Sequence, residues 1–159
     1  MTQKITPFLW FDKNAEEAMN FYVSIFKNSR IISIARYGDF MPEMKGKVLT
    51  GVFELEGVPF MAIDGGPHFH FTEAISLKVD CVTQEEVDEL WSKLIAGSGE
   101  EGQCGWLKDK FGLSWQIVPN IIEKLFTDPN PEKVNRAMQA MMPMKKLDIA
   151  VLTKAFNDE

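Results

Sequence analysis

The chain has few residues of the kinds that build metal clusters, disulfide scaffolds or membrane spans. Its 159 residues include two histidines and two cysteines. Cys81 and Cys104 lack zinc-ribbon spacing, and two cysteines exclude a disulfide-rich scaffold. No stretch reaches the roughly 18 apolar residues of a membrane helix, and the first residues lack the apolar run of a signal peptide. We therefore expect a soluble, cytoplasmic protein without a membrane partner.

Positive charge is also scarce. The 17 Lys and Arg residues face 23 Asp and Glu residues, so the formal net charge is −6. This balance argues against nucleic acid or an anionic membrane surface as a partner. The length, together with a hydrophobic fraction of 45 %, is typical of one globular domain.

A repeat is present instead. Residues 5–26 and 74–95 each begin as a short strand, continue through a helix-capping residue (Asn14 or Thr83), and place two glutamates in the first helical turn. Apolar residues then recur at i, i+3, i+4, i+7 and i+8, which predicts one buried stripe on each of two helices. The stripe residues are Ala18, Phe21, Tyr22, Ile25 and Phe26 in the first helix and Val87, Leu90, Trp91, Leu94 and Ile95 in the second.

Strand-like segments follow each predicted helix. They are 29–38, 47–57 and 58–64 after the first, and 104–110 and 111–119 after the second, with a weak candidate at 100–103. Gly57 and Gly112 mark tight turns. The order strand, helix, then up to three strands occurs twice, which predicts an α+β fold of tandem βαβββ modules.

The predicted organisation is one domain over 1–159. Module one spans 4–66, module two spans 70–119, and 120–159 form a helical C-terminal extension. Asn130 and Pro131 predict the start of one helix, and a second helix should follow Pro143. The methionine-rich apolar stripe of the first helix consists of Val134, Ala137, Met138, Met141 and Met142. We expect it to pack against the domain or across a dimer, with a dedicated partner-binding helix as the alternative.

Several stretches resemble a known family. They are PFLWFDKNAEEAMNFYVSIFKNS, GVPFMAIDGGP, FTEAISLKVDC, QEEVDELW, CGWLKDKFGLSWQIVP and MKKLDIAVL, which cover most of 7–152. The chain resembles the vicinal oxygen chelate superfamily of glyoxalase I and bleomycin-resistance proteins. Within it, the chain looks most like the PhnB-like family, labelled 3-demethylubiquinone-9 3-methyltransferase. The resemblance implies a glyoxalase-like fold whose curved sheets surround a cleft, and a homodimer.

The resemblance also implies four positions at which the superfamily's metal enzymes carry His or Glu. Here they fall near Pro7, Ser76, Met61 and Gln116. Proline and methionine supply no hard ligand, and serine with glutamine would make a weak, uncharged site. We therefore expect no metal at the usual centre and no other cofactor.

The two histidines allow another metal hypothesis. His68 and His70 lie in GGPHFHF, residues 65–71. On a strand they would point to one side, about 6.6 Å apart at Cα, and could bind zinc with Asp64 or Glu73 as a third ligand. Alternatively, the two phenylalanines pack inward and the histidines face solvent at the link between the modules. The sequence favours this second interpretation.

Other chemistry has little support. No G-x-G-x-G loop is present for S-adenosylmethionine, and no nucleophilic triad can be identified. Cys104 could be reactive if it were exposed beside Lys108, but a small buried residue on a strand is the simpler interpretation. Cys81, in an apolar run, should be structural.

The cleft remains as the candidate site. The resemblance assigns to its lining Trp10, Met61, Ser76, Trp106 and Gln116. It also places Phe60 and Trp115 against the helices. A mostly apolar pocket with a few polar groups suits a small, flat or aromatic molecule. We expect a small-molecule-binding protein without a metal centre. The alternative is an atypical metal-independent enzyme that uses Ser76 and Gln116, with methyl transfer or divalent-metal lyase or dioxygenase activity less favoured.

Overall fold

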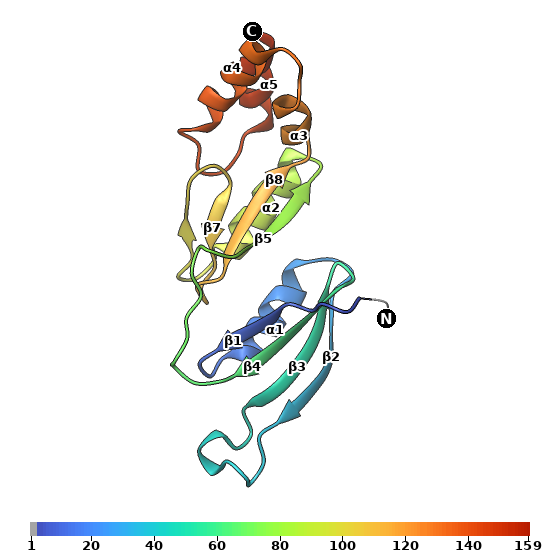
Figure 1. Cartoon of the computed structure of the whole chain (residues 1–159), viewed down its shortest axis with the longest axis vertical. Helices are drawn as coiled ribbons and strands as arrows, with labels where there is room; N and C mark the ends of the chain where they lie inside the picture. The colour runs from blue at the N-terminus through green and yellow to red at the C-terminus, as the bar shows by residue number, and fades with distance from the viewer. Residues whose placement is uncertain (1–2) are drawn as a thin grey trace. The chain divides into compact units, whose positions relative to one another are not determined.

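The computed structural model describes residues 3–159, which divide into two compact units with the same order of elements (Figure 1). Unit 1 ends at Phe71 and unit 2 is Thr72–Glu159. Each contains a strand, a helix and three further strands, so the predicted tandem βαβββ modules and the α+β class are confirmed. Unit 2 also carries three C-terminal helices.

Unit 1 holds one four-stranded sheet, called sheet A, with α1 packed on one face. Its elements are β1 (Phe8–Phe11), α1 (Ala15–Ile25), β2 (Arg30–Arg36), the 3₁₀ turn η1 (Pro42–Met44), β3 (Val48–Leu55) and β4 (Val58–Asp64). The strand order is β1-β4-β3-β2, with β1 parallel to β4 and the other pairs antiparallel.

The core of unit 1 lies between α1 and sheet A. Phe53 stacks on Tyr22 of α1 and on Phe60 of β4, with ring centroids 6.4 Å and 5.5 Å apart. The helix approaches so closely that a Cβ on Gly51 would lie 2.5 Å from the sulfur of Met19. The turn from β3 to β4 uses positive φ at both Glu56 (48°) and Gly57 (77°), as a tight hairpin requires.

Unit 2 repeats the plan around a second four-stranded sheet, called sheet B. Its elements are β5 (Ser76–Cys81), α2 (Gln84–Leu94), β6 (Glu100–Glu101), β7 (Trp106–Lys108) and β8 (Ser114–Pro119). The order is β5-β8-β7-β6, with β5 parallel to β8. The weak strand expected at 100–103 is present as β6. Cys104 and Gly105 have φ of 54° and 85°, so the segment predicted to begin a strand at 104 is a turn.

The two helix caps differ from each other. Thr83 caps α2 as predicted, because its hydroxyl accepts from Glu86 N at 3.2 Å, and Glu86 accepts in return from Val82 N. Asn14 precedes α1 as predicted, but its side chain makes no capping hydrogen bond. The carboxylate of Asp64 takes that role and accepts from Ala15 N at 2.8 Å.

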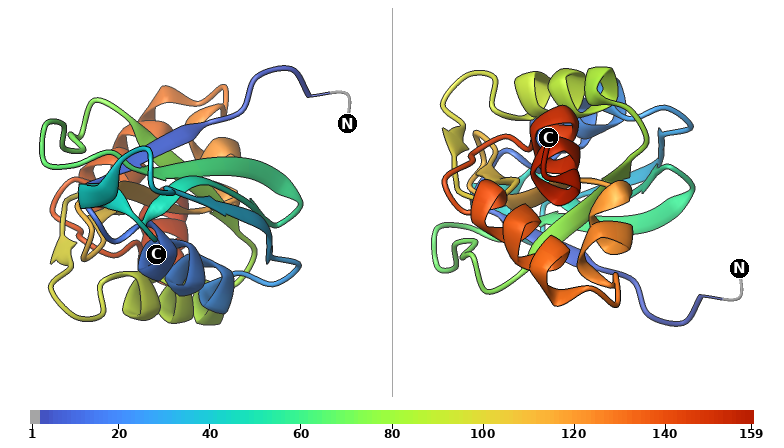
Figure 2. Two further views of the ribbon diagram at one scale, coloured as in Figure 1. Left: turned by 90° about the horizontal axis from the view of Figure 1, so that it is seen from below. Right: turned by 90° about the horizontal axis from the view of Figure 1, so that it is seen from above.

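Three helices follow sheet B. They are α3 (Ile121–Phe126), which was not predicted, α4 (Pro131–Met141) and α5 (Ile149–Asn157). They share a small core of Leu125, Ala137, Leu147 and Leu152. Figure 2 shows α4 beside α5, where Arg136 donates to the carbonyl oxygens of Ala155 and Phe156.

The predicted apolar stripe of α4 is only partly buried. Ala137 is fully buried, whereas Met138 and Met142 are 42 % and 64 % exposed. The extension is attached to unit 2 through backbone hydrogen bonds from Cys104 N to Met144 O and from Gly105 N to Lys145 O, both 2.7 Å. It therefore packs against its own unit, as expected. Within residues 3–159, no helix has the length and apolar character needed to cross a membrane.

Candidate functional site

The face of sheet B opposite α2 carries several polar side chains that are not packed in the core. Strand alternation sends Leu77, Leu107 and Trp115 toward α2. The other side, called the open face of sheet B, carries Ser76, Lys78, Trp106, Lys108, Ser114 and Gln116. It therefore brings together three of the five predicted site residues.

Gln116 is the centre of this face. Its Nε2 donates to the Oγ of Ser76 at 2.8 Å. In register, Gln116 lies opposite Trp106 on β7 and opposite Lys78 on β5. The Lys78 ammonium forms an ion pair with Asp80. An amide thus lies between an indole and a lysine, with a hydroxyl at hydrogen-bond distance.

These residues do not fit a divalent metal. Ser76 and Gln116 are uncharged and hydrogen-bond to each other, so they offer a divalent cation no anionic ligand. In unit 1, Met61 N donates to the carbonyl of Pro7 at 2.9 Å, and neither side chain supplies a hard ligand. Over residues 3–159, no three His, Cys, Asp or Glu side chains cluster as a metal site.

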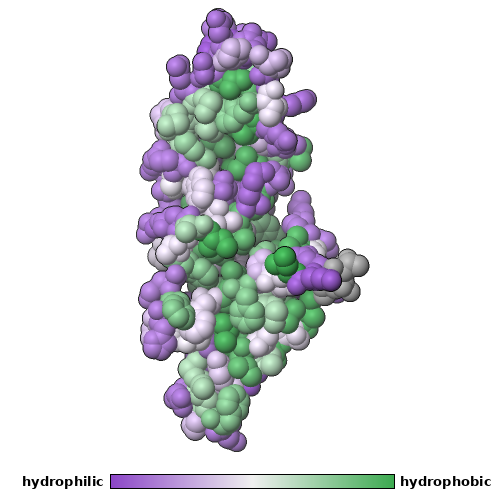
Figure 3. Space-filling model, viewed as in Figure 1, coloured by the Kyte–Doolittle hydropathy of each residue, from purple (hydrophilic) through white to green (hydrophobic). Residues whose placement is uncertain are grey.

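The other two predicted site residues lie together in unit 1. Trp10 and Met61 are half-buried on the face of sheet A opposite α1, called the open face of sheet A, beside Phe8, which is 51 % exposed. Figure 3 shows hydrophobic residues gathered over β1, β4 and β3 on this side. This face is apolar over β1 and β4, whereas toward β2 it carries the ion pair of Arg30 and Glu54.

The GGPHFHF segment is a loop, so the strand assumed in the zinc hypothesis is wrong. His68 and His70 are exposed, as the favoured interpretation expected. Phe69 is 65 % exposed rather than inward, yet its ring meets Trp10 edge to face at 5.0 Å. Phe71 does pack inward, against Phe11 at 5.4 Å.

Neither proposed third zinc ligand is free. Asp64 is 2 % exposed, and its two oxygens accept from Ala15 N and Val48 N at 2.8 Å and 2.9 Å. Glu73 forms an ion pair with Lys108 at 3.0 Å. Both carboxylates proposed as the third zinc ligand are therefore engaged in other contacts.

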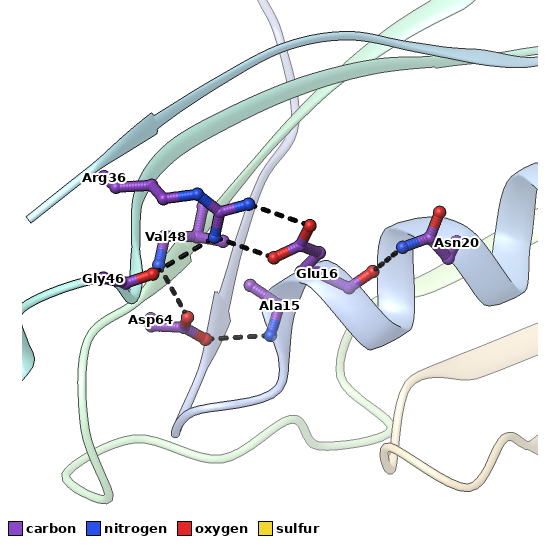
Figure 4. A network of polar contacts seen from close by, with 7 residues as sticks. All are labelled: Ala15, Glu16, Asn20, Arg36, Gly46, Val48 and Asp64. Atoms are coloured by element: carbon purple, nitrogen blue, oxygen red, sulfur yellow. Dashed lines mark hydrogen bonds and ion pairs between the residues drawn. The ribbon is translucent and has the colours of Figure 1, made fainter.

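The Asp64 contacts belong to a polar network at the start of α1 (Figure 4). Arg36 donates to both oxygens of Glu16, at 2.8 Å and 2.9 Å, and to Gly46 O at 3.1 Å. The hydrogen bonding between the Arg36 guanidinium and the Glu16 carboxylate lowers the pKa of Glu16 and raises the pKa of Arg36. A hollow of about 180 Å³ adjoins the network. Asp64 and Arg36 already bind groups of unit 1, so we assign them a structural role.

The cysteines offer no nucleophile to this site. Cys81 is fully buried, and burial raises the pKa of its thiol to about 12. The sulfur of Cys104 lies 3.7 Å and 3.8 Å from the carbonyl oxygens of Met141 and Met142. Cys104 is half-buried in a turn, so the interpretation of a small buried residue on a strand is wrong. Lys108, the positive charge that a reactive Cys104 would need beside it, pairs with Glu73 and Glu100.

Sequence reasoning missed Ser114. Ser114 is 1 % exposed and lines a cavity of about 100 Å³ together with Trp106 and Lys108. The available signal was alternation, because Ser114 lies two residues before Gln116 and therefore shares its face.

The fold and this site define a glyoxalase-fold protein of the vicinal oxygen chelate type, and comparisons with known proteins identify the family. The model of the 3-demethylubiquinone-9 3-methyltransferase family matches residues 3–118. The chain belongs to this PhnB-like family. A comparison with curated proteins finds no match.

Solved structures agree with this assignment. A putative 3-demethylubiquinone-9 3-methyltransferase, PhnB protein, from Bacillus cereus is 44 % identical, with a TM-score of 0.69 over 74 % of this chain and 99 % of that one. Protein PA1353 from Pseudomonas aeruginosa is 18 % identical (TM-score 0.61; 74 % and 98 % covered). The fosfomycin resistance protein FosX from Listeria monocytogenes is 17 % identical (TM-score 0.60; 80 % and 99 % covered). The last two share the fold alone.

Proposed function

We propose that this protein binds a small, flat molecule without a divalent metal at the superfamily's usual positions. The residues proposed to contact the molecule are Ser76, Trp106 and Gln116 on the open face of sheet B, and Trp10 and Met61 on the open face of sheet A. The observation that carries the proposal is the hydrogen bond from Gln116 to Ser76 beside Lys78. The polar groups of Ser76 and Gln116 are uncharged and hydrogen-bond to each other, which favours an organic ligand over a metal ion.

The chemistry of the open face of sheet B limits the ligand. The half-buried indole of Trp106 offers a flat apolar surface, and Gln116 offers an amide with a donor and an acceptor. A planar molecule with a polar substituent would use both groups. The apolar open face of sheet A, with Trp10 and Met61, supports an aromatic body for the ligand.

Ligand screening tests this proposal. Thermal unfolding of the full chain should shift upward with small aromatic compounds, because a ligand that binds only the folded state stabilises it. Trp106→Ala and Gln116→Ala should reduce the shift, whereas Gln139→Ala, at an exposed position of α4, should leave it unchanged. An absence of any shift across a broad aromatic set would contradict the proposal.

Metal analysis supplies an independent test. Protein purified without a histidine tag should contain substoichiometric divalent metal after dialysis. One tightly bound metal per chain, lost in Gln116→Ala or in His68→Ala, would overturn the proposed absence of a metal centre.

Methyl transfer, which the family description names, is a second candidate. It predicts that S-adenosylmethionine alone raises the unfolding temperature and that a methylated product accumulates with a quinol acceptor. A metal-independent reaction that uses Ser76 and Gln116 would instead convert a bound compound without S-adenosylmethionine. If methyl transfer is the function, S-adenosylmethionine should raise the unfolding temperature and adenine alone should not.

We also propose that the chain is a homodimer in the cytoplasm. The exposed apolar residues of sheet A, including Phe8, support a second copy as a partner. Light scattering should give twice the 18.1 kDa mass of the chain. A monomer at micromolar concentration would contradict the dimer.

A further inference from the structure

A small cavity in unit 2 has a polar group without an internal partner. The cavity holds about 100 Å³, and its lining consists of Glu73, Glu100, Glu101, Gly102, Trp106, Leu107, Lys108 and Ser114. Among the buried side-chain nitrogen and oxygen atoms of residues 3–159, only the Oγ of Ser114 lacks a hydrogen-bond partner. Buried hydroxyls are almost always paired, so this one points to a ligand.

The register of sheet B explains why Ser114 has no partner. Its neighbours on either side are Ser76 on β5 and Lys108 on β7. The Ser76 oxygen receives its hydrogen bond from Gln116. The Lys108 ammonium is held by Glu73 at 3.0 Å and by Glu100 at 3.3 Å. The polar atoms of both neighbours are bound to other groups, so the Ser114 hydroxyl lies at the cavity without a hydrogen-bond partner in the protein.

Charge selects the kind of group that fits. Glu73, Glu100 and Lys108 together carry one net negative charge, while Glu101 is engaged by Trp91 and Lys145. The Lys108 contact lowers the pKa of Glu73, which keeps this carboxylate ionised. The carboxylates of Glu73 and Glu100 keep acceptor lone pairs beyond their one contact each with Lys108, and the Ser114 hydroxyl can accept a hydrogen bond as well as donate one. A group rich in donors and positively charged satisfies this arrangement, and an anion does not.

Size and shape agree with a small head group. A volume of about 100 Å³ equals the space of roughly three water molecules, enough for an ammonium and one or two carbons. Trp106 borders the cavity and also lies opposite Gln116, so it connects the cavity to the rest of the open face of sheet B.

We propose that the ligand is an amine, whose ammonium group occupies this cavity, donates to Ser114 Oγ and is balanced by Glu73 and Glu100, while its flat body extends along Trp106 toward Gln116. This inference rests on the proposed function and adds the class of ligand. An aromatic surface next to the charge is also favourable for an ammonium group.

Three probes that share one aromatic ring separate the effect of the ligand's charge from the effect of its aromatic body. Benzylamine, benzyl alcohol and benzoate share a phenyl ring and carry positive, zero and negative charge near neutral pH. Their dissociation constants should be measured by NMR titration of the full chain. Benzylamine should bind about tenfold more tightly than benzyl alcohol, as expected for a charged hydrogen bond, and benzoate should bind most weakly.

Variants locate the effect. Ser114→Ala and Glu100→Gln should each weaken benzylamine binding by about tenfold and leave benzyl alcohol binding nearly unchanged. Their matched controls are Ser33→Ala, on an exposed strand position of unit 1, and Glu43→Gln, in the exposed turn η1, which should change nothing. Because Ser114 Oγ bonds to nothing in the protein and Glu100 is exposed, both variants should fold.

The outcomes distinguish the two proposals. Equal binding of all three probes, or tightest binding of benzoate, would overturn the amine assignment while supporting a flat aromatic ligand. Unchanged benzylamine affinity in Ser114→Ala would move the amine to another site and overturn the inference. Failure of benzylamine to bind would also overturn the amine assignment. The proposed function itself would be contradicted only if no compound of the wider aromatic screen shifted the thermal unfolding.

Discussion

Asp64 should be among the residues that contribute most to the stability of unit 1. It is 2 % exposed, and its two carboxylate oxygens accept from Ala15 N, at the start of α1, and from Val48 N, at the start of β3. One side chain at the end of β4 therefore joins a helix and a neighbouring strand. Replacing it with alanine leaves both backbone N–H groups without their acceptor.

The magnitude follows from these two donors. Each buried donor that loses its partner costs about 1–3 kcal/mol, so Asp64→Ala should lower the free energy of unfolding by about 2–6 kcal/mol. Asp64→Asn keeps one acceptor oxygen and should cost about 1–3 kcal/mol. Because a domain of this size is stable by about 5–15 kcal/mol in total, the alanine variant should be partly unfolded at moderate urea.

Urea unfolding, followed by circular dichroism, measures the loss. Amide hydrogen exchange at Ala15 and Val48 gives a local readout, which should accelerate at both residues in Asp64→Ala and unequally in Asp64→Asn. Asp12→Ala is the matched control, because Asp12 is exposed and close to α1. A loss below about 1 kcal/mol in Asp64→Ala, or one equal to the control, would refute the role assigned to Asp64.

Three further perturbations test other contacts. Gly65→Ala would place a Cβ 2.3 Å from the Trp10 ring, so near-UV circular dichroism should change more than in Gly38→Ala, where the nearest atom is 3.8 Å away. Burial raises the pKa of the Cys81 thiol to about 12, so this thiol should resist thiol reagents at pH 8 until the protein unfolds. Between pH 9 and 12 the thiol ionises in the unfolded chain only, which lowers the stability of the fold, and Cys81→Ala should remove that part of the loss. Arg36 lowers the pKa of Glu16, so this pair stabilises the fold at neutral pH and loses its effect as pH falls through that pKa; Glu16→Gln should lower the urea midpoint slightly at pH 7 and not at pH 2.

Periodicity alone predicted most of the fold. The apolar stripes located α1 and α2, and Gly57 located a hairpin, because these features depend on residues close in sequence. The cap of α1 could not be found this way, since Asp64 lies 49 residues from Ala15. The GGPHFHF loop was misjudged for a related reason: Phe69 packs against Trp10, a contact that strand alternation cannot describe.

The site was predictable in part. Ser76, Trp106 and Gln116 were assigned to one face, and the structure places them on the open face of sheet B. Ser114 shares that face, but its importance lies in what its neighbours do. Only the contacts of Lys108 with Glu73 and Glu100, and of Gln116 with Ser76, reveal an unpaired hydroxyl.

Strand register shows how the two repeats diverged. Met61 and Gln116 are equivalent, because each lies four residues after the glycine of its hairpin turn, Gly57 or Gly112. Met61 pairs with Phe8 and Gln116 pairs with Lys78, so the two pairs occupy equivalent positions. Three residues separate β1 from α1 but two separate β5 from α2, so aligning the repeats through their helices shifts the first strands by one residue. A shift of one residue reverses the face. The alignment therefore matched Pro7, which has the alternation of the buried Leu9, to Ser76 on the open face of sheet B.

The corrected equivalence bears on function. Residues facing the helices stay apolar in both units, as in Phe60 of unit 1 and Trp115 of unit 2, because each sheet must bury one face against a helix. The open faces are free of that requirement and differ at the equivalent positions where β1 meets β4 and β5 meets β8. The pair that is Phe8 and Met61 in unit 1 is Lys78 and Gln116 in unit 2. Polar specificity is therefore concentrated in unit 2, and substitutions on its open face should change which ligand binds, while those on the open face of unit 1 should change mainly how tightly apolar surface is held.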